Sequence, residues 1–163
     1  MTRTLILLRH GKSAYPDDVA DHERPLAPRG RREAGLAGRW LRAHQPPVDA
    51  VLCSTATRAR KTLAEAAVEA STDFLDDLYE TTPERVVAAI RRVPDDVSTL
   101  LVVGHEPVLS TTTLLLAADH DSDAARQIVE KFPTSAVAVL EVRGTWHDLG
   151  AGEAALIDFH IPR

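Results

Sequence analysis

The sequence predicts an α/β fold, a three-layer α/β/α sandwich with a mostly parallel sheet and an antiparallel edge. Three observations predict it. Residues 5–8 are four apolar residues in succession, and similar short runs recur, which is typical of strands buried on both faces. Segments with a helical spacing of apolar residues alternate with these runs, as in sheets covered by helices on both sides. The last two runs are joined by a short loop, so we expect them to pair antiparallel at one edge.

The N-terminal part of the chain is predicted to hold a strand, a polar loop and a long helix. Residues 3–9 form the strand, and three prolines keep residues 12–28 from becoming helical. Residues 29–44 carry apolar side chains at helical spacing, with arginines on the other face. The pair Pro46-Pro47 ends this helix.

A second strand and helix follow at residues 48–53 and 57–69. Ser54 or Thr55 is expected to cap this helix by accepting a backbone N–H. Pro83 suits the first turn of the next helix. The remaining elements are expected in this order: strand 72–76, helix 83–92, strand 99–103, helix 108–118, helix 124–131, strand 135–142 and strand 154–160.

Length and composition indicate one globular domain over residues 1–163, since 44% of the residues are hydrophobic and 26% are charged. The net charge of −5 argues against a broad nucleic-acid interface, which needs a basic face. Cys53 is the one cysteine, so nothing indicates an oxidising compartment. The apolar run at residues 5–8 is too short for a signal peptide or a membrane span. We expect a cytoplasmic monomer.

Charged side chains follow three predicted strands at the point where each strand ends. Arg9-His10-Gly11 follows the first, a helix bearing Arg58 follows the second, and Gly104-His105 follows residues 99–103. Arg9-His10-Gly11 alone is equally consistent with an ordinary solvated turn. Because the carboxyl ends of parallel strands meet at one edge of a sheet, we expect two arginines and two histidines to converge there. Arginine matches phosphate in charge and geometry, so the cleft is predicted to bind a phosphoryl group.

These residues belong to an ordered set of motifs that resembles the histidine phosphatase superfamily, which has the phosphoglycerate-mutase-like fold. Within it, the chain is most similar to the small branch that includes the SixA phosphohistidine phosphatases. The motifs are Leu8-Arg9-His10-Gly11, Arg24-Pro25-Leu26 with Arg29-Gly30, Ser54 with Arg58-Ala59 and Thr62, Val103-Gly104-His105-Glu106-Pro107, and Phe132-Pro133-Thr134-Ser135-Ala136.

The resemblance implies a role for each central residue. His10 is the nucleophile, which becomes a phosphohistidine before water releases the phosphate. Arg9, Arg58 and His105 bind the non-bridging oxygens, with His105 held as a cation by the charge of the phosphate. Since His10 attacks as neutral imidazole, we expect its other ring nitrogen to donate to a backbone carbonyl. The arginines supply the positive charge, so neither a metal nor another cofactor is expected.

Four further residues complete the expected site. Glu80 stands where larger relatives carry the acid that protonates the leaving oxygen, or else it is a surface acid beside a helix. Lys12 and Arg24 either extend the basic pocket or lie solvated on the surface. Gly11 lets the backbone come close to a bound group. The other histidines show no metal-ligand spacing and are interpreted as surface or structural residues: His22, His44, His120, His147 and His160.

The substrate is expected to be protein phosphohistidine. The elements predicted between Arg58 and His105 leave little chain for a lid domain, and an open site suits a phosphorylated side chain on a protein. Two alternatives remain: a phosphatase for small phosphomonoesters on the same fold, and a phosphate-binding adaptor without turnover. The intact set of Arg9, His10, Arg58 and His105 favours an enzyme.

Overall fold

A six-stranded sheet organises the protein, and its strand order is β3-β2-β4-β1-β5-β6. The structure is a computed structural model that describes residues 2–163. The strands are β1 (Thr2–Arg9), β2 (Ala50–Ser54), β3 (Ser71–Leu75), β4 (Thr99–Gly104), β5 (Val137–Arg143) and β6 (Ala154–His160). The helices are α1 (Pro28–His44), α2 (Thr57–Ala66), α3 (Pro83–Arg91), α4 (Val108–Leu116) and α5 (Asp123–Glu130), with short 3-10 helices η1 (Asp21–Glu23) and η2 (Asp76–Leu78).

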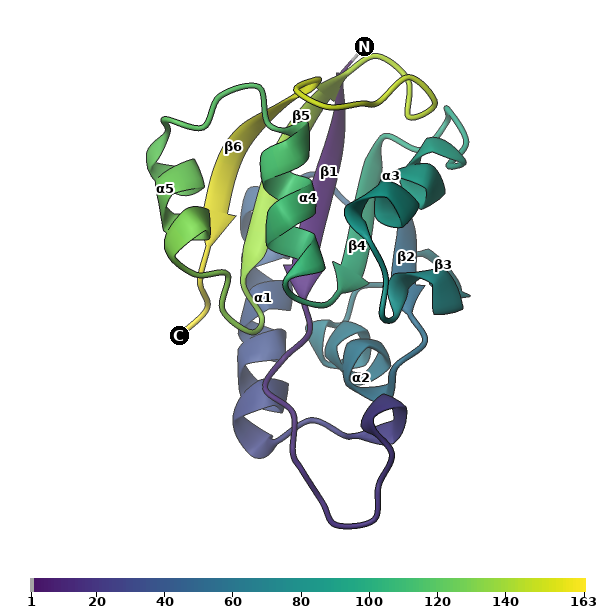
Figure 1. The fold of residues 1–163 in the computed structure, drawn as a ribbon, viewed down its shortest axis with the longest axis vertical. Coiled ribbons are helices and arrows are strands. Elements are labelled where there is room, and N and C mark those ends of the chain that lie inside the picture. The colour runs from purple at the N-terminus through teal and green to yellow at the C-terminus, as the bar shows by residue number, and fades with distance from the viewer. Residues whose placement is uncertain (1) are drawn as a thin grey trace.

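The sheet is mixed, as predicted. β1 to β4 run parallel to one another, whereas β5 pairs antiparallel with both β1 and β6. Figure 1 shows α3 and α4 in front of the sheet and α1 and α2 behind it, which makes the three layers. The described residues include no lid domain over the sheet edge. None of the helices in residues 2–163 has the length and apolar content of a membrane-spanning segment.

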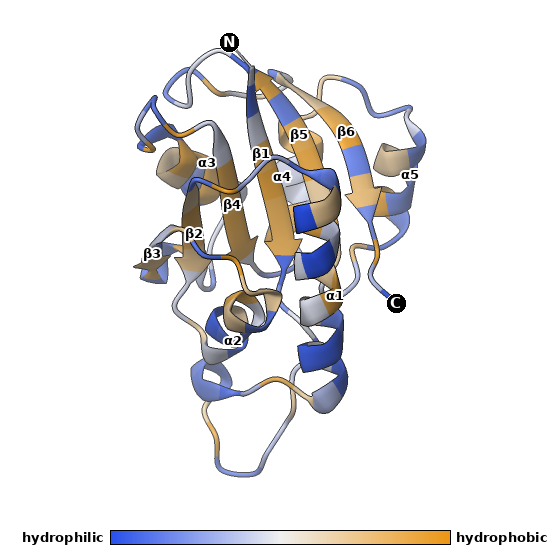
Figure 2. Ribbon diagram, turned by 180° about the vertical axis from the view of Figure 1, so that it is seen from behind, coloured by the Kyte–Doolittle hydropathy of each residue, from blue (hydrophilic) through white to orange (hydrophobic). Residues whose placement is uncertain are grey.

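The apolar run of β1 is buried on both faces because the sheet lies between two helix layers. Leu5 and Leu7 pack into the core under α3, α4 and α5. Ile6 and Leu8 point the other way, into the core under α1 and α2. Figure 2 shows this second face, where the central strands are hydrophobic and the outer sides of α1 are hydrophilic. The two-sided burial explains why the run lacks polar alternation.

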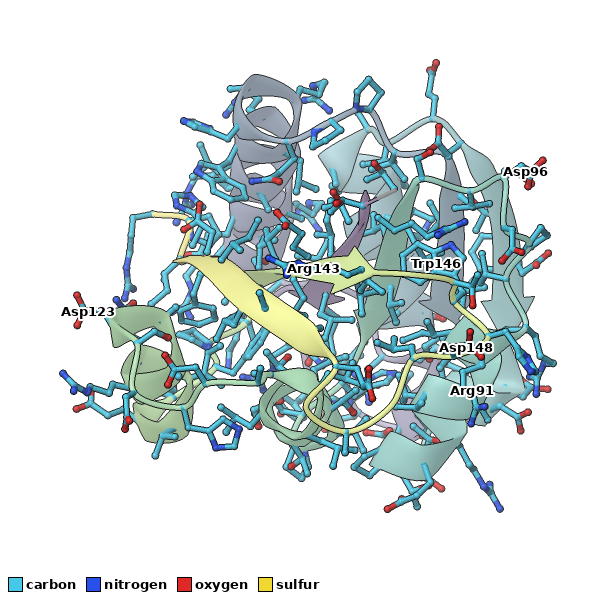
Figure 3. The ribbon with its side chains drawn as sticks, turned by 90° about the horizontal axis from the view of Figure 1, so that it is seen from above. Arg91, Asp96, Asp123, Arg143, Trp146 and Asp148 are labelled. Carbon is cyan, nitrogen blue, oxygen red and sulfur yellow. The ribbon has the colours of Figure 1, made fainter. Side chains whose placement is uncertain are left out.

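The loop between β5 and β6 covers the end of the sheet that lies opposite the carboxyl ends of β1, β2 and β4, as Figure 3 shows from above. Trp146 in this loop is fully buried and its indole N–H donates to the Val97 carbonyl at 2.8 Å. Arg3 donates to the carbonyls of Gly144 and Asp95. These bonds close one end of the sheet with structural contacts and leave the carboxyl end for the site.

Several predicted boundaries are wrong for local reasons. α1 begins at Pro28, which the sequence analysis assigned to the loop, because proline suits the first turn of a helix. α2 ends at Ala66, not residue 69, because Ala67 takes a left-handed conformation (φ 55°). β5 starts at Val137, two residues late, because the chain turns at Ser135 (φ 63°).

The predicted cap of α2 is also wrong. Ala56 occupies the cap position, and no side chain makes the capping hydrogen bond. Ser54 lies two positions too early and accepts the Ala56 N–H at 3.2 Å. The Ser54 hydroxyl also hydrogen-bonds to His105, so Ser54 contributes to the site next to this helix.

Candidate active site

Three parallel strands deliver their last residues to one cavity. Arg9 of β1 lies beside Gly104 of β4 in the sheet register, and Cys53 of β2 lies beside Val103. His10 and His105 therefore leave adjacent strands at the same edge, as the topology predicts. The cavity measures about 310 Å³. It is lined by Arg9, His10, Lys12, Ser13, Tyr15, Asp21, Arg24, Arg58, Tyr79, Glu80, His105, Glu106 and Thr134.

His10 is held in one tautomer by the backbone. Its Nδ1 lies 2.7 Å from the carbonyl oxygen of Gly11, and a carbonyl can only accept, so Nδ1 carries the hydrogen. Nε2 is then the nitrogen with the free lone pair. Burial lowers the pKa of His10 to about 3, and the charges of nearby Arg58 and Arg9 act in the same direction. The ring is therefore neutral at pH 7 and nucleophilic at Nε2.

Arg9 and Arg58 place two guanidinium groups around this imidazole. Arg9 donates through Nη1 to the Phe132 carbonyl at 2.8 Å. Arg58, of which only 7% is exposed, donates through Nη1 to the Asp21 carbonyl at 2.7 Å. Within residues 2–163, the buried Nε atoms of both arginines have no hydrogen-bond partner. Buried donors without acceptors are costly, so the pair favours a ligand rich in oxygen acceptors.

The cationic form predicted for His105 depends on the charge of a bound phosphate, and the protein by itself favours the neutral ring. Burial, followed by the charge of Arg58, lowers its pKa to about 4, so the ring is neutral at pH 7. Its Nε2 lies 2.8 Å from Ser54 Oγ. That hydroxyl oxygen also accepts from the Ala56 N–H at 3.2 Å, and since a hydroxyl can both donate and accept, Ser54 can pair with either neutral tautomer of His105. The charge of Asp21 already acts to raise this pKa, and the negative charge of a bound anion would raise it further toward the cationic form.

The segment at residues 132–136 wraps around the end of β1. The Ser135 N–H donates to the carbonyls of Arg9 and His10, both at 3.1 Å, and the Arg9 N–H donates to the Ala136 carbonyl. Thr134 lines the cavity. These bonds fix the backbone on either side of His10 and explain why the fifth motif, far along the chain, belongs to the same site.

Gly11 is used for packing. A Cβ at this position would lie 2.8 Å from the carbonyl oxygen of Gly30 in α1, so only glycine fits between the strand end and the helix. Its N–H donates to Thr62 Oγ1 at 2.8 Å, and Gly11 does not line the cavity. We expected the backbone of Gly11 to come close to a bound group, but it comes close to α1 instead.

The three remaining predicted residues all line the cavity. Lys12 is exposed, with its Nζ 5.9 Å from the ring centre of Tyr15. Arg24 packs its guanidinium 4.1 Å from the same ring centre and donates to Ser13 Oγ at 2.6 Å. Glu80 is exposed at the wall and holds a left-handed backbone conformation (φ 49°).

Asp21 and Tyr79 also line the cavity, although neither was among the predicted site residues. The Tyr79 hydroxyl donates to Asp21 Oδ2 at 2.6 Å, and Arg58 Nη2 donates to the same oxygen at 3.1 Å. The hydrogen bond from Tyr79 is the main reason that the pKa of Asp21 lies well below its usual range. One signal could have found Asp21: a site with several converging cations needs an acid nearby, and this residue stands three positions before Arg24.

The arrangement combines a neutral nucleophilic imidazole, two buried guanidinium groups and a second imidazole in one cavity. Such a set binds a phosphoryl group and supplies a nucleophile to it.

Known proteins resemble this chain in sequence and in fold. Residues 5–83 match the family model of the histidine phosphatase superfamily (branch 1). An uncharacterised protein of Mycobacterium tuberculosis (strain H37Rv) is 59% identical over 158 residues, which cover 96% of this chain and 100% of that protein.

Two solved structures resemble the whole chain. A candidate phosphohistidine phosphatase SixA from Nakamurella multipartitia has a TM-score of 0.92 and 39% identity, covering 99% of this chain and 97% of that one. The protein histidine phosphatase SixA in complex with tungstate has a TM-score of 0.79 and 24% identity, covering 98% and 97% of the two chains. The second likeness is one of fold.

Proposed function

The chain belongs to the histidine phosphatase superfamily, and from this membership we propose that it is a phosphatase that forms a covalent phosphohistidine at His10, without a metal, and acts on protein phosphohistidine. The observation that carries the mechanism is the bond between His10 Nδ1 and the Gly11 carbonyl. It leaves Nε2 as a neutral nucleophile in a cavity that Arg9, Arg58 and His105 also line.

The reaction takes two displacements. In the first, the Nε2 lone pair of His10 forms a bond to phosphorus, and the bond from phosphorus to the substrate nitrogen breaks. In the second, the oxygen of a water molecule bonds to phosphorus and the bond to Nε2 breaks, which restores the neutral imidazole and leaves the protons of the water on the released phosphate. Arg9, Arg58 and His105 stabilise the charge on the non-bridging oxygens in both steps.

The choice of protein phosphohistidine rests on the leaving group and on the shape of the site. A departing imidazole needs less help from an acid than an alkoxide does. Glu80, the expected acid, is exposed at the cavity wall and is not buried against the reacting centre. No lid domain covers the cavity within the described residues, which suits a side chain presented on a protein. The SixA proteins with the same fold are phosphohistidine phosphatases by name.

The test compares leaving groups on one peptide. Phosphate release is measured with chelator present from a phosphohistidine peptide, from the phosphoserine version of the same peptide, and from p-nitrophenyl phosphate. We expect much faster turnover of phosphohistidine than of phosphoserine, and little effect of Glu80→Gln on the phosphohistidine reaction. Glu84→Gln is the matched control, because Glu84 is an exposed acid on α3 that does not line the cavity.

Preference for the phosphoserine ester, together with a large loss in Glu80→Gln, would instead identify a phosphomonoesterase with Glu80 as its general acid. Binding of phosphate without turnover of any of the three substrates would identify an adaptor.

A further inference from the structure

We propose that Asp21 is a positioning residue, which orients Arg58 for the transferring phosphoryl group, an inference that rests on the proposed function. Asp21 belongs to η1, in the loop that joins β1 to α1. Its backbone carbonyl accepts from Arg58 Nη1 at 2.7 Å, and its Oδ2 accepts from Arg58 Nη2 at 3.1 Å. One residue thus holds both terminal nitrogens of this guanidinium.

The two bonds from Asp21 fix the orientation of the Arg58 guanidinium as well as its distance. A guanidinium is planar, so acceptors on both Nη atoms set the orientation of the whole group. The Nε of Arg58 is buried and has no hydrogen-bond partner among residues 2–163, so Asp21 holds the group through its two Nη atoms alone. A phosphoryl oxygen can use the remaining Nη hydrogens without displacing Asp21.

Asp21 also joins Arg58 to two other side chains that line the cavity. Its Oδ1 accepts from Arg24 Nε at 3.0 Å, and its Oδ2 accepts from the Tyr79 hydroxyl at 2.6 Å. The Tyr79 ring meets the His105 ring edge-on, with ring centres 5.6 Å apart. A single carboxylate therefore coordinates groups from the first loop, from α2 and from the segment after η2.

Two observations argue against a direct chemical role. The bonds from Tyr79, Arg24 and Arg58 all stabilise the carboxylate form, so Asp21 holds no proton to give at neutral pH. Its negative charge also opposes the binding of a phosphate in the same cavity. If Asp21 acts by orienting Arg58, its loss should therefore slow turnover without weakening the binding of phosphate.

The side chain of Asp21 is 54% exposed, whereas that of Arg58 is 8% exposed. Water can thus replace the carboxylate without opening the core, and we expect the folded state to tolerate the change. This separates the positioning role from a purely structural one.

The experiment measures kcat, KM and the inhibition constant of inorganic phosphate for Asp21→Asn, with p-nitrophenyl phosphate as substrate. We expect kcat to fall about tenfold, which is part of the roughly 10²–10³ that removal of one such donor costs. KM and the phosphate inhibition constant should stay the same or decrease. Glu23→Gln is the matched control, because Glu23 lies on the same turn, does not line the cavity, and hydrogen-bonds through its side chain to His22 and the half-buried Thr57. It should leave all three quantities within twofold.

A double-mutant cycle identifies the residue through which Asp21 acts. In the Arg58→Ala background, Asp21→Asn should change kcat by less than twofold. A tenfold loss in that background, an equal loss in Glu23→Gln, or a rise in the phosphate inhibition constant would overturn the inference. If the native chain turns over p-nitrophenyl phosphate but not the phosphohistidine peptide, the proposed substrate fails, and the cycle still decides the role of Asp21.

Discussion

The imidazole rings of His10 and His105 lie with their centres 5.1 Å apart and their planes tilted by 55°. They leave the ends of two adjacent parallel strands, β1 and β4. Burial lowers the pKa of both rings, to about 3 for His10 and to about 4 for His105. A charged ring would lack hydration in this buried place and would be repelled by Arg58, so both rings are neutral at pH 7.

This pair makes the stability of the fold depend on pH. In the unfolded chain both histidines take up protons near pH 6.5, whereas in the folded chain they do so only near pH 3 to 4. Between these values the unfolded state binds more protons, so stability falls as the pH falls. At pH 5 we expect a loss on the order of 2 kcal/mol for each histidine, relative to pH 7. Thermal unfolding at the two pH values measures it.

His105→Asn tests the assignment, because it should remove about half of the loss between pH 7 and pH 5. A melting temperature that is constant over this range would contradict the lowered pKa values.

His10→Ala is expected to abolish turnover and keep phosphate binding. The variant loses the nitrogen that bonds to phosphorus but keeps Arg9, Arg58 and His105. Phosphate release reports the first property and isothermal titration with inorganic phosphate the second. In the native chain, an acid-labile phosphoryl group should be trapped by rapid quenching and should be absent from the variant. Residual turnover in His10→Ala would refute the covalent mechanism.

Arg58→Ala should lower kcat by roughly 10²–10³, the usual effect of removing one donor to the transferring group. Arg60→Ala provides the control on the same helix. Arg60 is exposed, does not line the cavity and packs its guanidinium 4.2 Å from the ring centre of Phe74. Steady-state kinetics of both variants should show the loss for Arg58 alone. Similar losses in both would mean that the charge of α2, and not the position of Arg58, drives the reaction.

The strands and the two histidines could be predicted because their signals are local and strong. The continuous run of residues 5–8 requires burial on both faces, and the structure places Leu5 and Ile6 in the two separate cores. The topology then brings His10 and His105 to one edge. Neither inference needs information about side-chain packing.

The helix η1 and the contact of Asp21 with Arg58 could not be predicted for the opposite reason. A three-residue 3-10 helix has no periodicity to detect, and η1 is held by tertiary bonds. His22 Nε2 meets Thr55 Oγ1 at 2.9 Å, and Thr55 in turn donates to Asp76 Oδ1 at 2.6 Å. Thr55, just before α2, and Arg58 on α2 lie more than thirty positions from their partners in η1, so the sequence of the loop does not reveal them.

The contact between α1 and α2 yields a prediction about stability. A Cβ at Gly38 of α1 would lie 1.9 Å from the carbonyl oxygen of Ala66, the last residue of α2. That oxygen also accepts from Arg42 Nη1 at 2.7 Å, so it cannot simply turn away. Gly38→Ala must push the helices apart, and we expect a loss of about 1–3 kcal/mol in the free energy of unfolding.

Gly35→Ala, one turn earlier, makes the matched comparison. A Cβ there would lie 3.8 Å from its nearest neighbour, the Glu65 carbonyl oxygen, which is an ordinary contact. Alanine favours the helix over glycine by about 0.5–1 kcal/mol, so this variant should be more stable than the native chain. Urea unfolding of both variants measures the change in the free energy of unfolding, which should have opposite signs in the two. Because α2 carries Arg58, Gly38→Ala should also lower kcat, whereas Gly35→Ala should not. Stabilisation by both substitutions would show that the two helices are not in close contact.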